Sequence, residues 1–411
     1  MSNMLHDRTY LFNVKGVNII GNGDNGAIIG LDDEGLNFID KIKQGKLGEC
    51  SLSDKEKQIM TALNELGYFT RSAGNLNTAY LHVTDRCNLS CVGCYSFIEN
   101  RNSQKDLSTE ELLNIVDQLA ECGVKGITIS GGEPFLRTDM PQILERIKKH
   151  NMYAAAITNG TMDWDRVKEA LPYLDVLNVS VDGYNRETRF IRNDGIMDKV
   201  LDFVEHFKDF IPVNLVFTLH KKNVEYMKEY IQLANELNVS SNFSIFSVDP
   251  HDETFSGFVL DESDLGKISK FVNDVEGVYI EDSVINGQSD GLDGLGCKVG
   301  CGLGCGIVSV AANGDVFPCH MLHKEEMKMG SLKTDSLKNI LKNKEAKWSG
   351  ITVDDISDCS DCEYKYMCGG GCRGRSYLYH KALEHKDPFC TLTKLYLNKR
   401  TKIFEQIAQQ A

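Results

Sequence analysis

Long apolar runs are missing from this sequence. No stretch approaches the roughly 18 consecutive apolar residues of a membrane-spanning helix. The first residues, Met-Ser-Asn-Met, do not resemble the charged and then apolar start of a signal peptide. We therefore expect a cytoplasmic protein without a membrane partner.

Positive charge is also scarce. The chain has 45 Lys and Arg against 59 Asp and Glu, which gives a net charge of -14. Proteins that bind nucleic acid need a basic face, so no nucleic-acid partner is expected. A hydrophobic content of 42% and a charged content of 25% are typical of ordinary globular proteins, and 411 residues are enough for two or three domains.

Cysteine, in contrast, is abundant, with 14 residues. In a cytosolic chain, this number indicates metal binding rather than disulfides. Twelve of the cysteines fall in two groups, at 87–94 and 297–390. The remaining two, Cys50 and Cys122, are isolated, and we interpret them as structural thiols.

The first group, Cys87, Cys91 and Cys94, has the spacing C-x3-C-x2-C and follows a predicted strand at 79–84. A [4Fe-4S] cluster takes four ligands, so three cysteines leave one iron open to a substrate or cofactor. A tetrahedral zinc site would need a fourth Cys or His at short spacing, and the only nearby histidine, His82, lies inside the predicted strand. An iron-sulfur cluster is therefore favoured over zinc.

This array resembles the signature of the radical S-adenosylmethionine (SAM) superfamily. In that family, the open iron chelates the amino and carboxylate groups of SAM. The residue before the third cysteine is usually aromatic there and contacts adenine, whereas this chain has Gly93 at that position and Tyr95 just after the cysteine.

After residue 79, strand-like and helical stretches alternate. This alternation predicts parallel strands joined by crossover helices. The predicted strands are 79–84, 126–130, 153–158, 176–181, 213–219 and 243–248, and the predicted helices are 109–121, 140–150, 165–171, 197–207 and 224–237. Six strands predict an α/β fold with a partial (β/α)6 barrel, which is also the fold that the family resemblance implies. Sites in such barrels lie at the carboxyl ends of the strands, where the first cysteines are.

Other segments at these strand ends match the family. Gly131, Gly132 and Glu133 resemble its GGE motif: the glycines would let the backbone approach a ligand, and the carboxylate would lie near the SAM ammonium. The resemblance further implies that Ser180 contacts the SAM ribose and that Arg192 lies near the SAM carboxylate. A surface salt bridge is the alternative for Arg192. No acid-base pair or nucleophile stands out, so no catalytic residue is assigned.

The acidic, poorly patterned segment 249–296, with several glycines near its end, reads as a connection to a separate module. The cysteine spacing of that module resembles the SPASM domain. By resemblance, auxiliary cluster I takes Cys301, Cys305, Cys319 and Cys372, and auxiliary cluster II takes Cys359, Cys362, Cys368 and Cys390. Cys297 is left over; it either replaces a ligand of cluster I or stands apart, and cluster I either is closed or opens one position to a substrate thiolate. Structural zinc is the alternative for the whole module.

The segment before the barrel predicts a small β-hairpin with two helices. Two short strands surround a Gly-, Asn- and Asp-rich turn within 17–30, and apolar residues at helical spacing follow at 36–42 and 59–66. This pattern resembles the PqqD-like domain that binds leader peptides, in which case a leader would add as a strand. A plain cap on the barrel is the alternative. The predicted domains are 1–75, 76–285 and 286–411.

The resemblance implies an enzyme with three [4Fe-4S] clusters, one binding SAM and two auxiliary, that makes a 5′-deoxyadenosyl radical. Its expected partners are a precursor peptide with a leader and a flavodoxin- or ferredoxin-type electron donor. Thioether formation is the preferred reaction, and carbon-carbon cross-linking or epimerisation are alternatives. A formylglycine-forming, sulfatase-maturating enzyme is disfavoured by the long segment before Cys87 and by His320, where that group has an aspartate. A non-catalytic iron-sulfur electron carrier is the remaining alternative.

Overall fold

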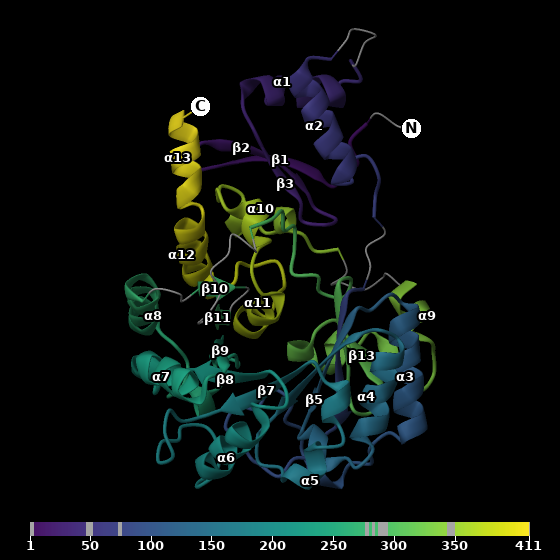
Figure 1. The fold of residues 1–411 in the computed structure, drawn as a ribbon, viewed down its shortest axis with the longest axis vertical. Helices are drawn as coiled ribbons and strands as arrows, with labels where there is room; N and C mark the ends of the chain where they lie inside the picture. The colour runs from purple at the N-terminus through teal and green to yellow at the C-terminus, as the bar shows by residue number, and fades with distance from the viewer. Residues whose placement is uncertain are drawn as a thin grey trace.

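The fold is built on one large mixed sheet. The computed structural model describes residues 4–46, 52–72, 76–275, 279–281, 284–286, 295–342 and 350–410. Cys50 and most of the glycine-rich end of the predicted connection lie outside these residues. The sheet has 11 strands in the order β10-β11-β9-β8-β7-β6-β5-β4-β12-β13-β14, and it occupies the lower half of the molecule in Figure 1.

The strands and longer helices have the following bounds. The strands are β1 (Thr9–Val14), β2 (Val17–Asn22), β3 (Ile28–Leu31), β4 (Thr78–Thr84), β5 (Gly126–Gly131), β6 (Tyr153–Thr158), β7 (Val176–Val181), β8 (Val213–Leu219), β9 (Ser240–Ile245), β10 (Tyr279–Glu281), β11 (Val284–Asn286), β12 (Ile307–Val310), β13 (Asp315–Phe317) and β14 (Gly330–Ser331). The helices are α1 (Asp33–Lys43), α2 (Asp54–Glu65), α3 (Thr109–Glu121), α4 (Met140–Lys149), α5 (Trp164–Val167), α6 (Met197–Phe207), α7 (Met227–Leu237), α8 (Glu262–Asp274), α9 (Leu337–Lys342), α10 (Lys365–Cys368), α11 (Arg373–His380), α12 (Cys390–Arg400) and α13 (Lys402–Gln410).

Strands β4 to β9 form the predicted six-stranded parallel barrel, each strand pairing with the next in sequence order. The last strand was predicted three residues too late: β9 begins at Ser240 and ends at Ile245. Phe246 and Val248, which follow the strand, are apolar and buried, whereas Ser240 and Ser241, which begin it, are polar. The apolar pattern is therefore displaced toward the carboxyl end relative to the strand.

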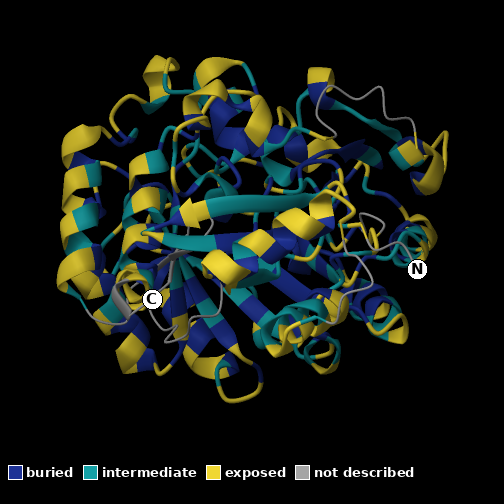
Figure 2. Cartoon of the chain, turned by 90° about the horizontal axis from the view of Figure 1, so that it is seen from above, coloured by how far each residue is buried: buried dark blue, intermediate teal, exposed yellow. Residues whose placement is uncertain are grey.

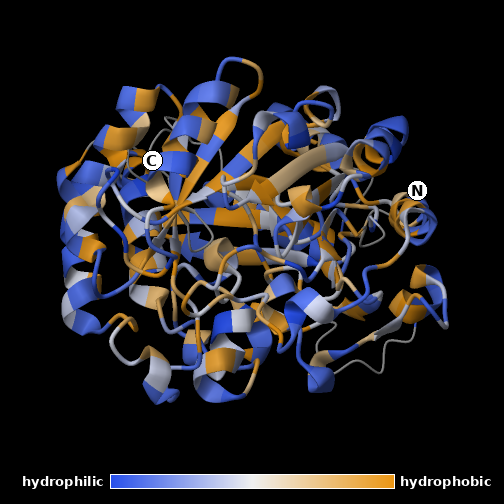
Figure 3. Ribbon diagram, turned by 90° about the horizontal axis from the view of Figure 1, so that it is seen from below, coloured by the Kyte–Doolittle hydropathy of each residue, from blue (hydrophilic) through white to orange (hydrophobic). Residues whose placement is uncertain are grey.

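The alternation of side chains along the barrel strands separates two environments. On β7, Leu177 and Val179 are buried under the helices, whereas Asn178 faces the barrel interior. There, the Nδ2 of Asn214 donates to the Oδ1 of Asn178 over 3.0 Å and to the Oδ1 of Asn242 over 2.7 Å. Buried residues follow the central strands in Figure 2, and the outer helices alternate hydrophobic and hydrophilic residues in Figure 3. The barrel therefore has an apolar outer layer and a polar interior.

The C-terminal module is continuous with the barrel. Its strand β12 pairs in parallel with β4, and β13 and β14 extend the sheet further. The segment predicted as a connection contains a helix, α8, with Asp261 and Asp264 as its capping box and Ile268 and Val272 buried. The sequence hid this helix because acidic residues and serine dominate its first turn, although that is what a cap requires.

The N-terminal unit has three strands rather than the predicted two. The missed strand, β1, pairs with β2 through a turn in which Lys15 and Gly16 both have positive φ, at 54° and 84°. This is the geometry of the type I′ hairpin. The two predicted helices are α1 and α2. The sheet rests on the C-terminal module: the ring centroids of Tyr10 and Tyr366 are 4.6 Å apart, and α13 lies beside β2 (Figure 1).

Among the described residues, no helix is both long and apolar enough to cross a bilayer.

Candidate active site

The loop that carries Cys87, Cys91 and Cys94 leaves the carboxyl end of β4 and is held by the loop after β5. The backbone N–H of Gly132 donates to the carbonyl oxygen of Thr84 over 2.7 Å, and that of Glu133 donates to the carbonyl of Arg86 over 2.8 Å. A Cβ on Gly132 would lie 2.0 Å from the Arg86 oxygen. The close approach that these glycines permit is therefore to the cysteine loop itself.

The three thiols are half-buried neighbours. Burial raises the pKa of Cys87 and Cys91, and the adjacent thiols of the trio add to the rise. Two N–H groups point at Cys87 Sγ, from the Leu89 backbone at 3.5 Å and from Asn159 Nδ2 at 3.9 Å. Hydrogen bonds of this kind stabilise the sulfur of a metal-bound thiolate.

The same surroundings test whether the trio fits an iron-sulfur cluster. Arg101 is 7% exposed, its Nη1 donates to Cys94 Sγ over 3.8 Å, and its buried Nη2 has no hydrogen-bond partner in the described chain. A buried positive charge needs an anion, and iron-bound thiolates supply one. Within the described ranges, no three Cys, His, Asp or Glu side chains are arranged to hold a single metal ion. Three thiols beside a buried guanidinium group without a carboxylate partner fit the three cysteine ligands and the negative charge of a cluster with one open iron.

Glu133, predicted to face SAM, is fully buried at the junction of two barrel strands. Its carboxylate accepts hydrogen bonds from Thr158 Oγ1 at 2.9 Å, Asn159 N at 2.8 Å and Phe135 N at 3.1 Å. Burial nevertheless raises its pKa to about 7. The side chain thus ties the loop after β5 to the end of β6, and its contact with SAM stays a prediction.

Arg192 lies near the cysteine loop. Burial raises the pKa of Cys91 and Glu133, and the charge of Arg192 opposes both rises. Its Nε is buried without a hydrogen-bond partner, and no carboxylate of the described residues is at ion-pair distance. The alternative of a surface salt bridge is therefore not supported. Ser180, on β7, is half-buried and shares the interior face of the barrel with Asn178.

Gly93 has φ +64°, and the ring of Phe246 fills the place of its missing side chain: a Cβ there would lie 2.2 Å from Phe246 Cζ. The cysteine loop has no aromatic side chain at position 93, and the ring of Phe246, just after β9, occupies that place instead. Phe246 was not identified from the sequence, because its neighbour on the loop is some 150 residues away along the chain.

A group of aromatic and imidazole rings, missed by the sequence analysis, lines the space between the two cysteine regions. The ring centroids of Tyr80 and His320 are 4.0 Å apart, those of His82 and His323 are 4.4 Å apart, and those of Tyr95 and His320 are 5.6 Å apart. Tyr95 follows Cys94, and His320 follows Cys319. Burial lowers the pKa of His320 and of His323 to about 4, so this wall is uncharged at neutral pH.

In the C-terminal module, the cysteines assigned by resemblance to cluster II line one small pocket. These four are Cys359, Cys362, Cys368 and Cys390. The backbone that reaches them includes a run of three glycines with positive φ, 369–371. The structure therefore brings this predicted ligand set together.

The cluster I set is partly assembled. Burial raises the pKa of Cys319, and the nearby thiols of Cys372 and Cys301 add to the rise. Cys305 is exposed on the turn between Gly302 and Gly306. Three of the four predicted ligands are thus neighbours, and the place of Cys305 in the set stays a prediction.

Cys297 does not lie with these cysteines. It is 3% exposed, its backbone N–H donates to the carbonyl of Gly26 over 2.8 Å, and its Sγ would be 2.7 Å from a Cβ on Gly21. It therefore packs against β2 of the N-terminal sheet, which argues against its replacing Cys301 or Cys305.

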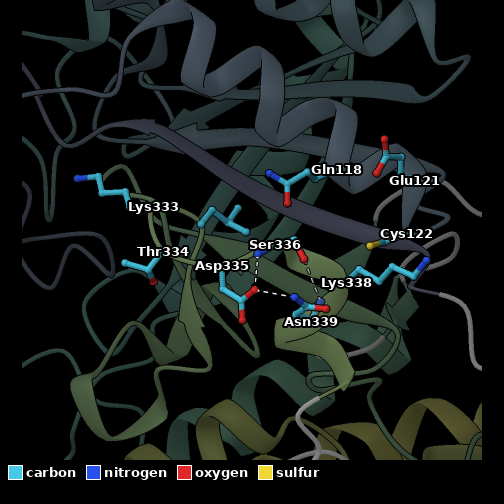
Figure 4. Close-up of a pocket in the computed structure, with 10 residues that line it drawn as sticks. Gln118, Glu121, Cys122, Lys333, Thr334, Asp335, Ser336, Lys338 and Asn339 are labelled. Atoms are coloured by element: carbon cyan, nitrogen blue, oxygen red, sulfur yellow. Dashed lines mark hydrogen bonds between the residues drawn. The ribbon is translucent and has the colours of Figure 1, made fainter.

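A further cavity lies between the end of α3 and the loop before α9, and Figure 4 shows its lining. Gln118 Oε1 accepts a hydrogen bond from Leu337 N over 2.8 Å at its edge. Cys122 lines it and is half-buried. Because α3 ends where β5 begins, this cavity belongs to the amino end of the strands, away from the cysteine loop.

Comparison with family models defines the class of protein. The model of the radical SAM superfamily matches residues 81–234, and that of SPASM, an iron-sulfur cluster-binding domain, matches residues 301–363. The first range contains the cysteine loop and all the residues predicted to contact SAM. These matches show that the chain contains a radical SAM domain followed by a SPASM domain; it is an enzyme that uses [4Fe-4S] clusters and SAM.

The similar proteins are distant in sequence, and their names describe more than one reaction. The AdoMet-dependent heme synthase of Methanosarcina barkeri is 26% identical over 75% of this chain and 94% of its own. The PqqA peptide cyclase of Granulibacter bethesdensis is 25% identical over 76% of this chain and 86% of its own. Streptococcus suis SuiB, solved with its precursor peptide SuiA, has a TM-score of 0.59 and 17% identity, covering 95% of this chain and all of SuiB. Coverage of 95% includes most of the N-terminal unit, so that part of the fold is shared too.

Proposed function

We propose that this protein modifies a ribosomally made precursor peptide by radical chemistry and that the modification is a thioether cross-link from a cysteine sulfur to a carbon. The observation that carries the proposal is the position of the trio Cys87, Cys91 and Cys94. These thiols lie on the loop after β4, and the ring of Tyr95, next to Cys94, is in contact with that of His320, next to Cys319, with centroids 5.6 Å apart.

The proposed ligand sets are those that the family resemblance implies. Cys87, Cys91 and Cys94 would hold the SAM-binding cluster, and a cluster bound there would supply the electron that cleaves SAM into methionine and a 5′-deoxyadenosyl radical. Auxiliary cluster I takes Cys301, Cys305, Cys319 and Cys372, and auxiliary cluster II takes Cys359, Cys362, Cys368 and Cys390. A flavodoxin- or ferredoxin-type protein is the proposed electron donor.

The residues of the chain that are proposed to orient SAM come from the carboxyl ends of two strands, β5 and β7. Gly131 and Gly132 press the backbone after β5 against the cysteine loop. Arg192 brings a positive charge close to Cys91, where the SAM carboxylate is expected, and Ser180 offers a hydroxyl group from β7. The barrel excludes water behind them because its outer layer is apolar.

The N-terminal sheet is the proposed leader site. Within the described residues, β3 pairs only with β2, whereas β1, at the other edge, carries Tyr10 and Phe12 against Tyr366. An extended leader can therefore add as a strand along β3. The precursor should bind much more tightly than the same peptide without its leader; equal affinities would contradict this site.

The test of the reaction is the mass of a small peptide encoded beside this gene, after anaerobic incubation with the enzyme, SAM and a reductant. A loss of two hydrogens per event, with cysteine thiols consumed, supports the thioether. The same loss with thiols intact indicates a carbon-carbon link, and an unchanged mass with deuterium uptake from heavy water indicates epimerisation. A control with a porphyrin substrate is needed because the heme synthase is an equally similar relative; turnover of the porphyrin and not the peptide would contradict the proposal.

A further inference from the structure

The chain that follows the three cysteines folds back onto them. Asn100 adopts a left-handed conformation, with φ 53°, and starts the short helix η1 (Arg101–Ser103). From this helix, Asn102 Oδ1 accepts a hydrogen bond from the backbone N–H of Cys87 over 2.9 Å. The segment thus clamps the cysteine loop from the side opposite to β5.

Arg101 makes the deepest contact of this clamp. Its Nε donates to the carbonyl oxygen of Asp85 over 2.8 Å, and its Nη1 donates to Cys94 Sγ over 3.8 Å. The first contact fixes the direction of the planar guanidinium group. The second places a permanent positive charge beside the third thiol of the trio.

The neighbouring arginines form ion pairs with carboxylates, whereas Arg101 does not. Arg86, on the cysteine loop, pairs with Asp106 at 2.7 Å, and Arg137 pairs with Asp139 at 2.6 Å. Arg101 is more buried than Arg86, yet no carboxylate in the described part of the chain lies within ion-pair distance of it.

A guanidinium group cannot lose its proton in a protein. The carboxyl of Asp85 is close enough to feel the charge of Arg101 but forms no ion pair with it, so the anion nearest to Nη1 is the thiolate of Cys94.

We infer that Arg101 is a positioning residue that orients the Cys94 thiolate and raises the reduction potential of the SAM-binding cluster. Reduction adds one negative charge to the cluster, and a fixed positive charge stabilises the reduced form more than the oxidised form. Because Arg101 is buried, solvent screens this effect poorly. Hydrogen bonds to cluster sulfurs act in the same direction. The inference rests on the proposed ligation by Cys87, Cys91 and Cys94.

The test is a redox titration of the reconstituted holoenzyme, followed through the electron paramagnetic resonance signal that added SAM perturbs, which identifies the SAM-binding cluster. In R101Q, which loses the charge, we expect a lower midpoint potential. In R101K, which keeps a charge but cannot reach both Asp85 and Cys94, we expect a smaller shift in the same direction. The matched control is R86Q, which removes the same charge from the same loop at a position 40% exposed; solvent screens that charge, so its potential should shift much less than that of R101Q.

An unchanged potential in R101Q with full iron content overturns the inference. If R101Q does not take up iron, R101K decides, and an unchanged potential in that variant overturns it as well. Failure of the ligand assignment itself is separate: a SAM-perturbed signal that persists after Cys87, Cys91 and Cys94 are all replaced by Ala would show that the cluster lies elsewhere.

Discussion

The cysteine loop after β4 and a second group, the pocket cysteines of the C-terminal module, are built in different ways. The three thiols of the loop lie on one short segment, are half-buried, and are held by backbone hydrogen bonds from β5. The four thiols of the second group come from separate segments, the short helix η9 (Ser357–Cys359), the turn after it, α10 and α12; three are half-buried like those of the loop, and Cys359 is buried. Three ligands on one segment leave one iron of a cluster open to SAM, so we call the loop the open region; four ligands complete a cluster, so we call the second group the enclosed region.

The way in which each region is stiffened differs as well. Behind the pocket, Arg375 and Asp387 form a buried ion pair. The carboxylate of Asp387 also accepts hydrogen bonds from Cys372 N at 2.7 Å and Phe389 N at 2.8 Å. One side chain thus connects the predicted ligands of both auxiliary clusters. The cysteine loop relies instead on two glycines and on Arg101, so small changes should affect it locally.

The largest effect is expected from a change confined to the open region, the loss of its three cysteines. Replacing Cys87, Cys91 and Cys94 by Ala should abolish the formation of 5′-deoxyadenosine, because no ligand then remains for the SAM-binding cluster. The iron of two four-iron clusters should stay bound. Product analysis and the iron content per chain measure the two outcomes, and continued production of 5′-deoxyadenosine would refute the assignment.

The second prediction concerns the enclosed region, which should lose stability when the ion pair between Arg375 and Asp387 is removed. Asp387→Asn leaves Arg375 charged and buried without its partner, and loss of one partner of such a pair costs about 3–5 kcal/mol. We expect a lower free energy of unfolding and loss of auxiliary-cluster iron. Asp354→Asn is the matched control: it removes a partner of Lys365, 2.6 Å away, from a pair in the same module whose carboxylate is 39% exposed, and should cost only about 1 kcal/mol. Equal effects of the two would contradict the comparison.

The third prediction concerns the close backbone contact between Gly132 and Arg86, which holds the cysteine loop in place. In Gly132→Ala, the new Cβ would meet the Arg86 carbonyl oxygen at 2.0 Å, so the cysteine loop must move, at a cost of about 1–3 kcal/mol. SAM cleavage should fall more than thermal stability does. Gly266→Ala, on the exposed face of α8 with no atom within 4 Å of the new Cβ, should leave both unchanged or raise stability slightly.

Elements that show a clear pattern over a few consecutive residues were predicted from the sequence. Features that depend on contacts between distant segments of the chain, or on weak local signals, were missed. The bounds of β6, β7 and β8 follow from apolar runs between turns, and the cysteine loop follows from its spacing. Strand β1 was missed because its turn, Lys15-Gly16, has only one glycine, although lysine adopts the positive φ there. Helix α8 was missed because its cap resembles an acidic linker.

The site shows the same limit. Cys297 lies four residues before Cys301, a spacing typical of a ligand, yet it packs on β2, far away along the sequence. Arg101 looks like any surface arginine until Asn100 turns the chain back onto Cys94. Glu133 was identified from its motif, but its partners Thr158 and Asn159 belong to the next strand. The spacing of cysteines along the sequence identifies metal ligands within one segment. The side chains that surround those ligands are identified only from the folded structure.

The smallest expected effect concerns the pH dependence of stability. Burial raises the folded-state pKa of Glu133 to about 7 from an ordinary value of 4.5, so between these pH values the folded chain holds a proton that the unfolded chain has released. Stability should therefore fall as pH rises through this window, by at most about 1.4 kcal/mol per pH unit from this group. Glu133→Gln cannot ionise and should remove that part of the slope.

The measurement is the free energy of unfolding of the metal-free chain at several pH values between 4.5 and 7. Glu111→Gln is the control, since Glu111 is exposed and its hydrogen bond with the Ser108 backbone lowers its pKa. The lowered pKa gives a slope of the opposite sign below pH 4.5 and none inside the window. A slope that is the same in the parent and in Glu133→Gln would mean that the carboxylate is already ionised in the folded state, held by hydrogen bonds from Thr158, Asn159 and Phe135. In that case, the positive charge of Arg192, which lowers the pKa of Glu133 without forming an ion pair with it, would help to stabilise the buried carboxylate.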